Sequence, residues 1–312
     1  MKILVTGGAG FVGTHLCRAL LERGDQVVCL DNFATSSPRS VQALRGQPGF
    51  SMIEADVCTP LVEPDDFDAI AHLACPASPD EYLRLPLETL AIGSHGSETV
   101  LALARRSGAR VLLASTSEVY GDPKEHPQRE SYWGNVNPIG PRSVYDESKR
   151  YAEALFAAYR RTLGTNTAIV RIFNTYGPGL RPNDGRVVSN FIAQALAGDP
   201  ITIYGDGSQT RSFCYVSDLV SGLVKMIDSD APGPINLGNP NETTVRALAT
   251  MVIELTGSSS KIVERPIPVD DPKTRRPDIA LAAEVLGWTP QVPLAEGLAR
   301  TIEWQRSLQA DT

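Results

Sequence analysis

The fold is decided by one stretch at the start of the chain, Lys2-Ile3-Leu4-Val5-Thr6-Gly7-Gly8-Ala9-Gly10-Phe11-Val12-Gly13. Its first residues, 2–6, form a short apolar and β-branched run, which predicts a buried parallel strand. The pattern of residues 14–23 predicts an amphipathic helix that ends at Gly24. Residues 26–30 predict a second strand, which reaches Asp31. The order strand, glycine turn, helix, strand, acid is that of a βαβ unit.

The glycines of this turn are Gly7, Gly10 and Gly13, spaced G-x-x-G-x-x-G. The spacing differs by one residue from the G-x-G-x-x-G fingerprint, but the physical requirements are the same. The turn must be tight, the backbone must approach a pyrophosphate, and the helix N-terminus must offer N–H donors. We therefore predict a dinucleotide site that includes Phe11 and Val12. For a glycine pattern alone, the alternative is a tight βα turn without a ligand.

Acidic residues at strand ends indicate which dinucleotide binds. Asp31 lies 18 residues after the last glycine. A carboxylate there accepts a hydrogen bond from a ribose 2′-hydroxyl and repels a 2′-phosphate, which favours NAD over NADP. Asp56 and Val57 follow the third expected strand and suit an adenine ring, although a helix-capping aspartate is the alternative. Asn32 and Leu73 complete the cofactor-binding residues that we predict.

A second stretch, Ser143-Val144-Tyr145-Asp146-Glu147-Ser148-Lys149-Arg150, places a tyrosine and a lysine four residues apart. On a helix the two side chains project from one face. A neighbouring ammonium group favours the phenolate and lowers the pKa of the tyrosine. Tyr145 is thus a candidate base, tuned by Lys149. A half-buried tyrosine beside a solvated lysine is the alternative.

Polar residues also follow the later expected strands. Thr116 and Glu118 follow the fifth strand, and Asn174 follows the sixth. Ligands of open parallel sheets bind beyond the carboxyl ends of the strands, so Thr116 is placed to contact the oxygen that Tyr145 would deprotonate. Local backbone hydrogen bonding by Thr116 and a solvated Glu118 are the alternatives.

The whole pattern predicts an α/β fold, a Rossmann-type doubly wound parallel sheet with a smaller C-terminal substrate-binding portion. We assign residues 1–180 to an NAD-binding domain, to which later elements return, and residues 181–312 mainly to substrate binding. The remaining strands are expected at 51–54, 69–74, 111–114, 167–172 and 201–204. The remaining helices are expected at 86–107, 146–161, 187–197, 216–227, 245–255 and 294–304.

Composition excludes several classes of protein. The net charge of −7 argues against a nucleic-acid-binding surface. Five scattered cysteines without a Cys-x-x-Cys pair favour a reduced, cytoplasmic protein over a disulfide framework or a zinc site. The four histidines lack metal-ligand spacing, so we expect no metal. No apolar run reaches membrane-spanning length, and a strand that starts at Lys2 leaves no room for a signal peptide.

Together, the glycine turn, Asp31, Thr116, Tyr145 and Lys149 resemble the extended short-chain dehydrogenase/reductase superfamily. Longer motifs resemble one family within it, the UDP-glucuronate decarboxylases or UDP-xylose synthases. They are Cys75-Pro76-Ala77-Ser78-Pro79, Ser115-Thr116-Ser117-Glu118-Val119-Tyr120-Gly121-Asp122-Pro123, Asn137-Pro138-Ile139-Gly140-Pro141-Arg142, Tyr145-Asp146-Glu147, Arg171-Ile172-Phe173-Asn174-Thr175-Tyr176-Gly177-Pro178, Asn183-Asp184-Gly185-Arg186-Val187-Val188-Ser189-Asn190-Phe191 and Arg275-Arg276-Pro277-Asp278.

The resemblance implies a reaction that converts UDP-glucuronate into UDP-xylose. Tyr145 takes the proton of the sugar 4-hydroxyl while C4 is oxidised by NAD. The resulting β-keto acid loses carbon dioxide, with the electrons delocalised toward the 4-oxygen that Tyr145 and Thr116 stabilise. C5 is then protonated and the hydride returns to C4. No further cofactor or metal is needed.

The resemblance also assigns contacts to the nucleotide sugar. It places Tyr204 against the uracil ring of UDP and Arg211 on the diphosphate, where a strand-edge aromatic and a surface arginine are the alternatives. Arg275 orients the sugar or its phosphates through its guanidinium fork and joins the catalytic set Thr116, Glu118, Tyr145 and Lys149. The remaining substrate-binding residues are Tyr82, Asn174, Arg186 and Val188.

The same resemblance implies a homodimer, paired through helices near 98–106 and 146–161. Helices that are covered within one chain are the alternative. Two departures from the family stand out. Gly93 replaces the usual asparagine, and the loop 34–38 lacks the usual glycine. The first removes a hydrogen bond expected behind the catalytic residues, and the second alters the adenosine side of the cofactor site.

Two other functions share most of these motifs. A nucleotide-sugar 4-epimerase or 4,6-dehydratase uses the same glycine turn and Tyr/Lys pair. Thr116-Ser117-Glu118 argues against both, since dehydratases usually carry an Asp-Glu pair here and epimerases a small residue in place of Glu118. A non-catalytic NAD sensor is the third alternative. Such proteins commonly lose the Tyr/Lys pair, which this chain keeps.

One prediction concerns Glu118. If its charge helps to expel the substrate carboxylate, Glu118→Gln should slow release of carbon dioxide from UDP-glucuronate while NAD affinity stays the same. Carbon dioxide release and NAD titration measure the two effects separately. Unchanged turnover in the variant would rule out this role.

Overall fold

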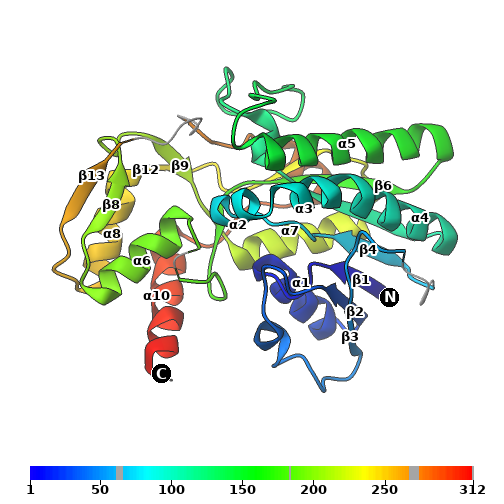
Figure 1. The fold of residues 1–312 in the computed structure, drawn as a ribbon, viewed down its shortest axis with the longest axis horizontal. Helices are drawn as coiled ribbons and strands as arrows, with labels where there is room; N and C mark the ends of the chain where they lie inside the picture. Colours follow the sequence, from blue (N-terminus) through cyan, green and yellow to red (C-terminus); the bar gives the residue numbers. More distant parts are fainter. Residues whose placement is uncertain (61–65, 183, 267–273, 311–312) are drawn as a thin grey trace.

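A computed structural model describes residues 1–60, 66–182, 184–266 and 274–310. Its centre is a seven-stranded sheet in the order β11-β6-β5-β4-β1-β2-β3 (Figure 1). Neighbouring strands of this sheet are parallel throughout. The strand order reverses between β1 and β4, which makes this point the topological switch of the sheet. The predicted Rossmann-type sheet is confirmed.

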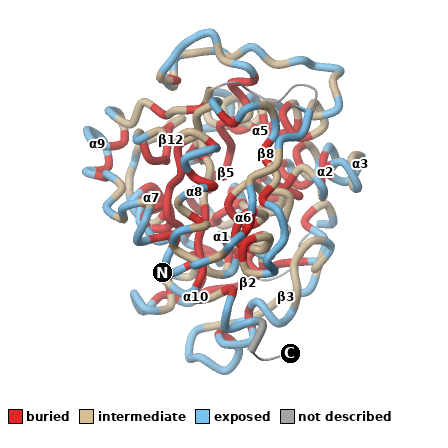
Figure 2. Tube along the Cα trace, turned by 90° about the vertical axis from the view of Figure 1, so that its left-hand side faces the viewer, coloured by how far each residue is buried: buried red, intermediate tan, exposed pale blue. Residues whose placement is uncertain are grey.

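Six of the seven strands of the sheet lie close to their predicted positions, whereas β11 was not predicted. The seven strands are β1 Lys2–Thr6, β2 Gln26–Asp31, β3 Phe50–Glu54, β4 Ala69–His72, β5 Arg110–Thr116, β6 Thr167–Ile172 and β11 Ile235–Leu237. Every residue of β4 and β5 is buried, as expected for parallel strands covered on both faces. Figure 2 shows β5 as a buried line through the middle of the molecule.

Two hydrophobic cores cover the two faces of the sheet. Ile3 and Val5 of β1 belong to one core, and Leu4 between them belongs to the other, because successive side chains of a strand point to opposite faces. The first core packs under α1 Phe11–Glu22 and α7 Val216–Asp228, and the second under α4 Ser97–Ser107 and α5 Ser143–Leu163. The sheet is thus doubly wound, and its strand ends are left open to ligands.

The helical region predicted at 86–107 is interrupted by one wider turn. It consists of α3 Pro86–Ala91, a π turn over Ile92–Gly96, and α4. Gly93 lies in this turn, directly against the Tyr/Lys helix α5. A Cβ at Gly93 would lie 2.7 Å from both the Cβ and the carbonyl oxygen of Ser148. The missing side chain therefore lets the two helices approach closely, which explains the departure from the usual asparagine in terms of packing.

Beyond the sheet, the second half of the chain forms short strands and peripheral helices. Strand pairs are β8 Ile201–Tyr204 with β13 Ile262–Arg265, β9 Thr210–Ser212 with β12 Glu242–Thr244, and β7 Thr175–Tyr176 with β10 Cys214–Tyr215. Helices are α6 Val187–Ala197, α8 Val245–Thr256, α9 Ala280–Leu286 and α10 Leu294–Ala310. Figure 1 shows β8, β13, α6, α8 and α10 gathered to one side of the sheet.

Several of these elements were not predicted. The strands β7, β9, β10 and β12 have only two or three residues each, too few to show a periodic pattern. A short helix, α2 Pro79–Arg84, follows the proline-rich loop at Cys75. It places Tyr82 beside α5, with its ring against that of Tyr145.

Candidate active site

A cavity of about 900 Å³ opens at the carboxyl ends of the sheet strands. Every residue that the sequence predicts for catalysis, cofactor binding or substrate binding lies on its wall. They are Gly7, Gly10, Phe11, Val12, Gly13, Asp31, Asn32, Asp56, Val57, Leu73, Tyr82, Thr116, Glu118, Tyr145, Lys149, Asn174, Arg186, Val188, Tyr204, Arg211 and Arg275. The fold therefore brings the three predicted sets into one place. Asn183, from the motif that contains Arg186, lies outside the described residues.

The glycine turn closes one side of this cavity. Gly7 has φ +69°, and a Cβ there would lie 2.7 Å from the amide nitrogen of Ala74. A Cβ at Gly13 would lie 2.2 Å from the carbonyl oxygen of Gly7. The turn is thus folded tightly against both α1 and β4. Gly10 caps α1 without a side chain, so the first amide groups of the helix are left for an anionic ligand such as a pyrophosphate.

Asp31 fits the predicted ribose site. One carboxylate oxygen accepts from the Ala9 amide at 3.0 Å, and the other accepts from the Phe33 amide at 2.9 Å and the Ser36 hydroxyl at 2.8 Å. A carboxylate has four lone-pair positions, which leaves one for a further donor such as a ribose hydroxyl. Asn32 donates to Asp56 at 3.1 Å and joins the two acidic strand ends. The donor and acceptor set of this chain therefore fits a bound NAD.

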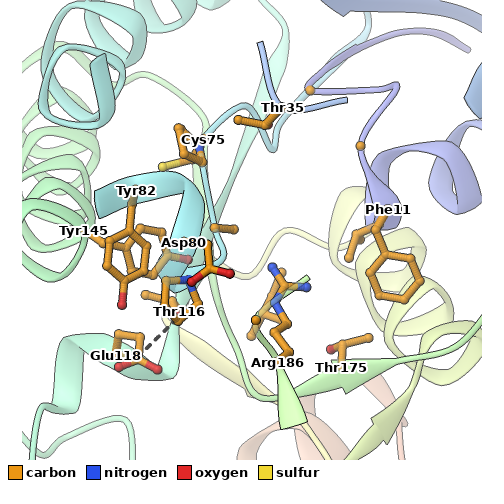
Figure 3. A pocket seen from close by; sticks show the side chains of 18 of the residues that line it. Phe11, Thr35, Cys75, Asp80, Tyr82, Thr116, Glu118, Tyr145, Thr175 and Arg186 are labelled. Atoms are coloured by element: carbon orange, nitrogen blue, oxygen red, sulfur yellow. Dashed lines mark hydrogen bonds between the residues drawn. The ribbon is translucent and has the colours of Figure 1, made fainter. Parts of the chain in front are cut away.

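Tyr145 lies in the first turn of α5, with its ring stacked on that of Tyr82. The ring centroids are 5.1 Å apart and the planes differ by 8° (Figure 3). Burial raises the pKa of Tyr145, and the nearby Cys75 adds to this, while a hydrogen bond with Thr116 acts in the opposite direction. The pKa of Tyr145 is therefore raised in this structure and not lowered as expected from its spacing to Lys149, because desolvation by burial is the largest influence on it.

Lys149 and Thr116 are two polar side chains close to Tyr145. The Lys149 ammonium donates to the Ala114 carbonyl of β5 at 2.9 Å and lies 6.0 Å from the centre of the Tyr145 ring. The Thr116 hydroxyl accepts from the backbone amide of Glu118 at 3.2 Å (Figure 3). Thr116 therefore satisfies local backbone and also contacts Tyr145, so its two interpretations from the sequence are compatible.

Glu118 is held between two guanidinium groups. Arg142 donates to one carboxylate oxygen at 2.8 Å, and Arg275, which is 3% exposed, forms an ion pair with the other. Burial opposes ionisation of Glu118, but Arg275 and Arg142 outweigh it and lower its pKa to about 2. The three groups together carry a net positive charge. This end of the cavity is therefore suited to an anionic group, such as a sugar carboxylate.

Sequence reasoning missed Arg142 as a site residue, although it ends one of the quoted motifs. Its position just before α5 was the available signal, since that position places it next to Tyr145. The motif gave no sign that Arg142 pairs with Glu118, because the two residues are 24 positions apart. A contact of this kind depends on how α5 docks on the sheet.

Arginines and an aromatic side chain line the outer part of the cavity. Arg186 caps α6 and lies 3.2 Å from Asp184. Figure 3 shows Arg186 in the same cavity as Tyr145 and Glu118. Arg211 of β9 donates to the Thr210 carbonyl at 2.9 Å. Tyr204, at the end of β8, is 48% exposed, which leaves its ring free to pack against a planar ligand.

Over the described ranges of the chain, no three or more His, Cys, Asp or Glu side chains cluster in a way that would hold a metal ion. None of the helices described there combines the length and apolar character that a membrane span needs.

Known proteins match the chain over most of its length. The sequence model of the NAD dependent epimerase/dehydratase family matches residues 3–238. UDP-glucuronic acid decarboxylase 1 of Arabidopsis thaliana is 53% identical over 97% of this chain and 69% of its own length. UDP-glucuronic acid decarboxylase 1 of Danio rerio is 52% identical over 97% of this chain and 72% of its own.

Solved structures share the fold at lower sequence identity. The UDP-glucuronic acid 4-epimerase from Bacillus cereus, in complex with UDP-glucuronic acid and NAD, has a TM-score of 0.88 and 29% identity and covers 99% of this chain and 100% of its own. The UDP-glucose 4-epimerase from Thermotoga maritima has a TM-score of 0.89 and 28% identity, with coverage of 99% and 100%. Fold similarity thus extends across activities, whereas the higher identities belong to decarboxylases.

The arginine pair around Glu118 predicts a pH-dependent contribution to stability. The pKa of Glu118 is depressed from 4.5 to about 2 in the folded protein. Its contribution is therefore complete above about pH 4.5 and is lost as the pH falls toward 2. The difference in unfolding free energy between wild type and Glu118→Gln should shrink by about 3 kcal/mol across this range.

Denaturant unfolding at several pH values measures this difference. The matched control is Glu264→Gln, whose ion pair with Arg246 is 59% exposed on the glutamate side, so the control should differ from wild type by little at any pH. A Glu118→Gln difference that stays constant from pH 6 to pH 3 would contradict the expected coupling.

Proposed function

Because the chain belongs to the NAD-dependent epimerase/dehydratase family, and within it to the UDP-glucuronic acid decarboxylases, we propose that it converts UDP-glucuronate into UDP-xylose and carbon dioxide. The observation that carries this proposal is the ion cluster at the inner end of the cavity. Arg142 and Arg275 give it a net positive charge beside Tyr145 and Thr116. A uronic acid has a carboxylate to place there, whereas a neutral hexose has none.

Side chains of the cavity divide the proposed work between them. When bound, NAD supplies an acceptor for the hydride of C4 and later returns it. Tyr145 accepts the proton of the 4-hydroxyl in its phenolate form, which the Lys149 ammonium group favours against the burial that raises its pKa, and gives the proton back at the end of the cycle. Thr116 contacts Tyr145 and donates to the 4-oxygen as negative charge develops there. Lys149, fixed on the Ala114 carbonyl, holds its positive charge near both groups.

Glu118 takes a role that differs from simple repulsion of the substrate carboxylate. Its charge is shared between two arginines, so it does not stand alone beside the sugar. We assign it the task of aiming Arg142 and Arg275 into the cavity, where a guanidinium fork suits an oxyanion. A substrate carboxylate would compete with Glu118 for the same two arginines and so weaken their ion pairs. When it leaves as carbon dioxide, which is neutral, this competition ends.

The outer cavity suits the UDP portion of the substrate. We place the uracil ring against Tyr204 and the diphosphate near Arg211 and Arg186, with Asn174, Val188 and Tyr82 around the sugar. Guanidinium groups and an exposed aromatic ring are the side chains that such a nucleotide needs. We also propose that residues 181–312 mainly serve this binding, while residues 1–180 hold NAD.

A 4-epimerase is the second candidate, because the solved structures with similar folds include such enzymes. It would use Tyr145 and Thr116 for the same oxidation at C4. The outcome differs, because an epimerase keeps the carboxylate and inverts C4. The decarboxylase is favoured because the relatives with higher sequence identity carry that name.

Incubation of the purified protein with UDP-glucuronate and NAD tests the proposal. We expect carbon dioxide and a UDP-pentose by mass spectrometry, with no lasting rise in nicotinamide absorbance. A UDP-4-keto-pentose with a lasting rise would retain decarboxylation but not the return step. An unchanged mass would contradict the decarboxylase, and conversion of UDP-glucose to UDP-galactose would then identify an epimerase.

We further propose that two copies of the chain pair through α4 and α5, the helices expected near 98–106 and 146–161, and that α3, which packs against α5, extends this surface. Three apolar side chains are exposed there, Leu87 (76%), Tyr151 (48%) and Leu90 (39%). Exposed apolar groups that gather on one face are typical of an interface.

A cytoplasmic location agrees with the odd number of scattered cysteines.

Light scattering after size exclusion checks the dimer. Leu87→Asp with Tyr151→Asp should give a monomer, because charges would be buried against an apolar partner surface. The matched control is Val285→Asp on α9, a residue that is 43% exposed, which should leave the mass unchanged. A monomeric wild type, or a double variant that stays dimeric, would contradict this interface.

A further inference from the structure

The proposed decarboxylation needs a proton that Tyr145 does not provide. When the bond between C5 and the carboxyl carbon breaks, its electron pair moves toward C4 and the 4-oxygen, and carbon dioxide leaves. A new C5–H bond must then form, so one proton has to enter the sugar. Tyr145 only returns to the 4-oxygen the proton that it took from it. The inference that follows rests on the proposed function and concerns the source of the C5 proton.

Two buried polar atoms beside the ion cluster have no hydrogen-bond partner among the described residues. They are the hydroxyl of Tyr82 and the Oδ1 atom of Asp146. Tyr82 is 2% exposed and Asp146 is 6% exposed. A buried polar atom without a partner costs free energy and needs an explanation. Neither atom has a task in the oxidation at C4, so both are available for another step.

Tyr82 is placed to reach the sugar. It lines the cavity, and its ring lies flat on that of Tyr145 at 5.1 Å. Figure 3 shows Tyr82 descending from α2 over Tyr145 toward Glu118. A sugar whose 4-oxygen contacts Tyr145 therefore has one of the two carbons next to C4 close to Tyr82, and C5 is assigned to this place. Burial raises the pKa of Tyr82, so its hydroxyl keeps its proton and acts as a donor.

Asp146 differs from the other acidic groups of this region. Burial raises its pKa, and the charge of Glu118 and of Glu147 adds to this, while Arg142 and Arg275 act against it; the result is about 7. Glu118, by contrast, is ionised at that pH. Asp146 also interacts electrostatically with Tyr82. It is therefore a carboxyl group that holds a proton near neutral pH, next to the groups that surround the sugar.

We propose that the Tyr82 hydroxyl delivers the proton that replaces the carboxylate at C5, and that Asp146 restores the proton of Tyr82 through an intervening water molecule. In this step the C5–H bond forms with the electron pair left by carbon dioxide, as the O–H bond of Tyr82 breaks. The Tyr82 hydroxyl and Oδ1 of Asp146 do not hydrogen-bond to each other, so the transfer between them runs through a water molecule, which gives a proton to the Tyr82 oxygen and takes the proton of the Asp146 carboxyl group. The Asp146 carboxylate then regains a proton from solvent. Nothing is oxidised or reduced in this exchange.

Turnover of UDP-glucuronate in heavy water tests the source of the proton. Wild type should place one deuterium at C5 of UDP-xylose, in one of the two possible orientations, as read by nuclear magnetic resonance. Tyr82→Phe should keep the stacked ring but lose this preference, with kcat lowered by about a hundredfold. The initial rise in nicotinamide absorbance on mixing with substrate should persist, which shows that the variant is folded and oxidises C4.

The pH dependence of kcat tests Asp146, which acts through Tyr82. The protonated carboxyl is the active form, so wild-type kcat should fall as the pH rises through about 7. Asp146→Asn, which has no proton to exchange, should have a low kcat without this fall. The matched control is Glu147→Gln, which should keep the fall and move it slightly to lower pH, because the Glu147 charge raises the pKa of Asp146.

The outcomes separate this inference from the proposed function. If wild type releases no carbon dioxide from UDP-glucuronate, the proposed function fails and the inference falls with it. If wild type does so, but Tyr82→Phe keeps the single deuterium orientation and Asp146→Asn keeps the fall in kcat with pH, only the proton source is wrong. The inference would also be overturned if both Asp146→Asn and Glu147→Gln abolished the decrease of kcat with rising pH. The decrease would then depend on the total charge of α5 and not on the Asp146 carboxyl group.

Discussion

The organisation of the site depends on one interaction, the ion cluster that joins Glu118 to Arg142 and Arg275. Its members come from the end of β5, from the residue before α5, and from a segment 157 positions after Glu118. The cluster therefore ties the sheet, the Tyr/Lys helix and the C-terminal half to one point. A buried carboxylate is costly unless it is paired. The free-energy cost of an unpaired Glu118 therefore favours the arrangement of the three segments in which both arginines contact it.

Behind the cluster, a second polar network fixes the same elements. Glu153 of α5 accepts from Arg171 of β6 at 2.7 Å and from the Ser115 hydroxyl of β5 at 2.6 Å. Tyr120 donates to Asn236 of β11 at 2.8 Å. Hydrogen bonds that run from one element to the next leave few alternative positions for α5. The helix that carries Tyr145 and Lys149 is thus fixed against β5 and β6, and pre-organisation of this kind favours catalysis.

Local pattern was sufficient for much of the fold. The order of strand, glycine turn, helix and acid around Gly7 and Asp31 identified the sheet class, because each signal there depends on neighbouring residues. The same holds for Tyr145 and Lys149, whose spacing is fixed by one helix. Short strands such as β9 were not predicted, because three residues are too few to show a periodic pattern. The strand β9 forms only by pairing with β12. Position at a strand end, which local pattern does give, was enough to place Thr116 and Asn174 at the cavity.

Properties that depend on burial or on distant partners lay beyond the sequence. Lys149 was expected to lower the pKa of Tyr145, but the depth of the phenol in the protein decides the direction. Arg142 and Asp146 stand within quoted motifs. The ion pair of Arg142 with Glu118 and the electrostatic interaction of Asp146 with Tyr82 nevertheless arise only when α2, α5 and β5 meet. Desolvation and interactions between charges that are distant in the sequence arise only on folding, so a local motif cannot predict them.

The sheet also sets an order in which a growing chain can fold. Its edge strand β11 pairs with β6 through Ile235–Leu237, and α7, which covers one core, begins only at Val216. A nascent chain of 180 residues, although it already carries the glycine turn and the Tyr/Lys helix, would expose β6 as an open edge and leave that core uncovered. Such edges attract other strands. During synthesis the protein must therefore wait for its last third before its first half is protected, which makes slow or interrupted translation of that region a time of risk for aggregation.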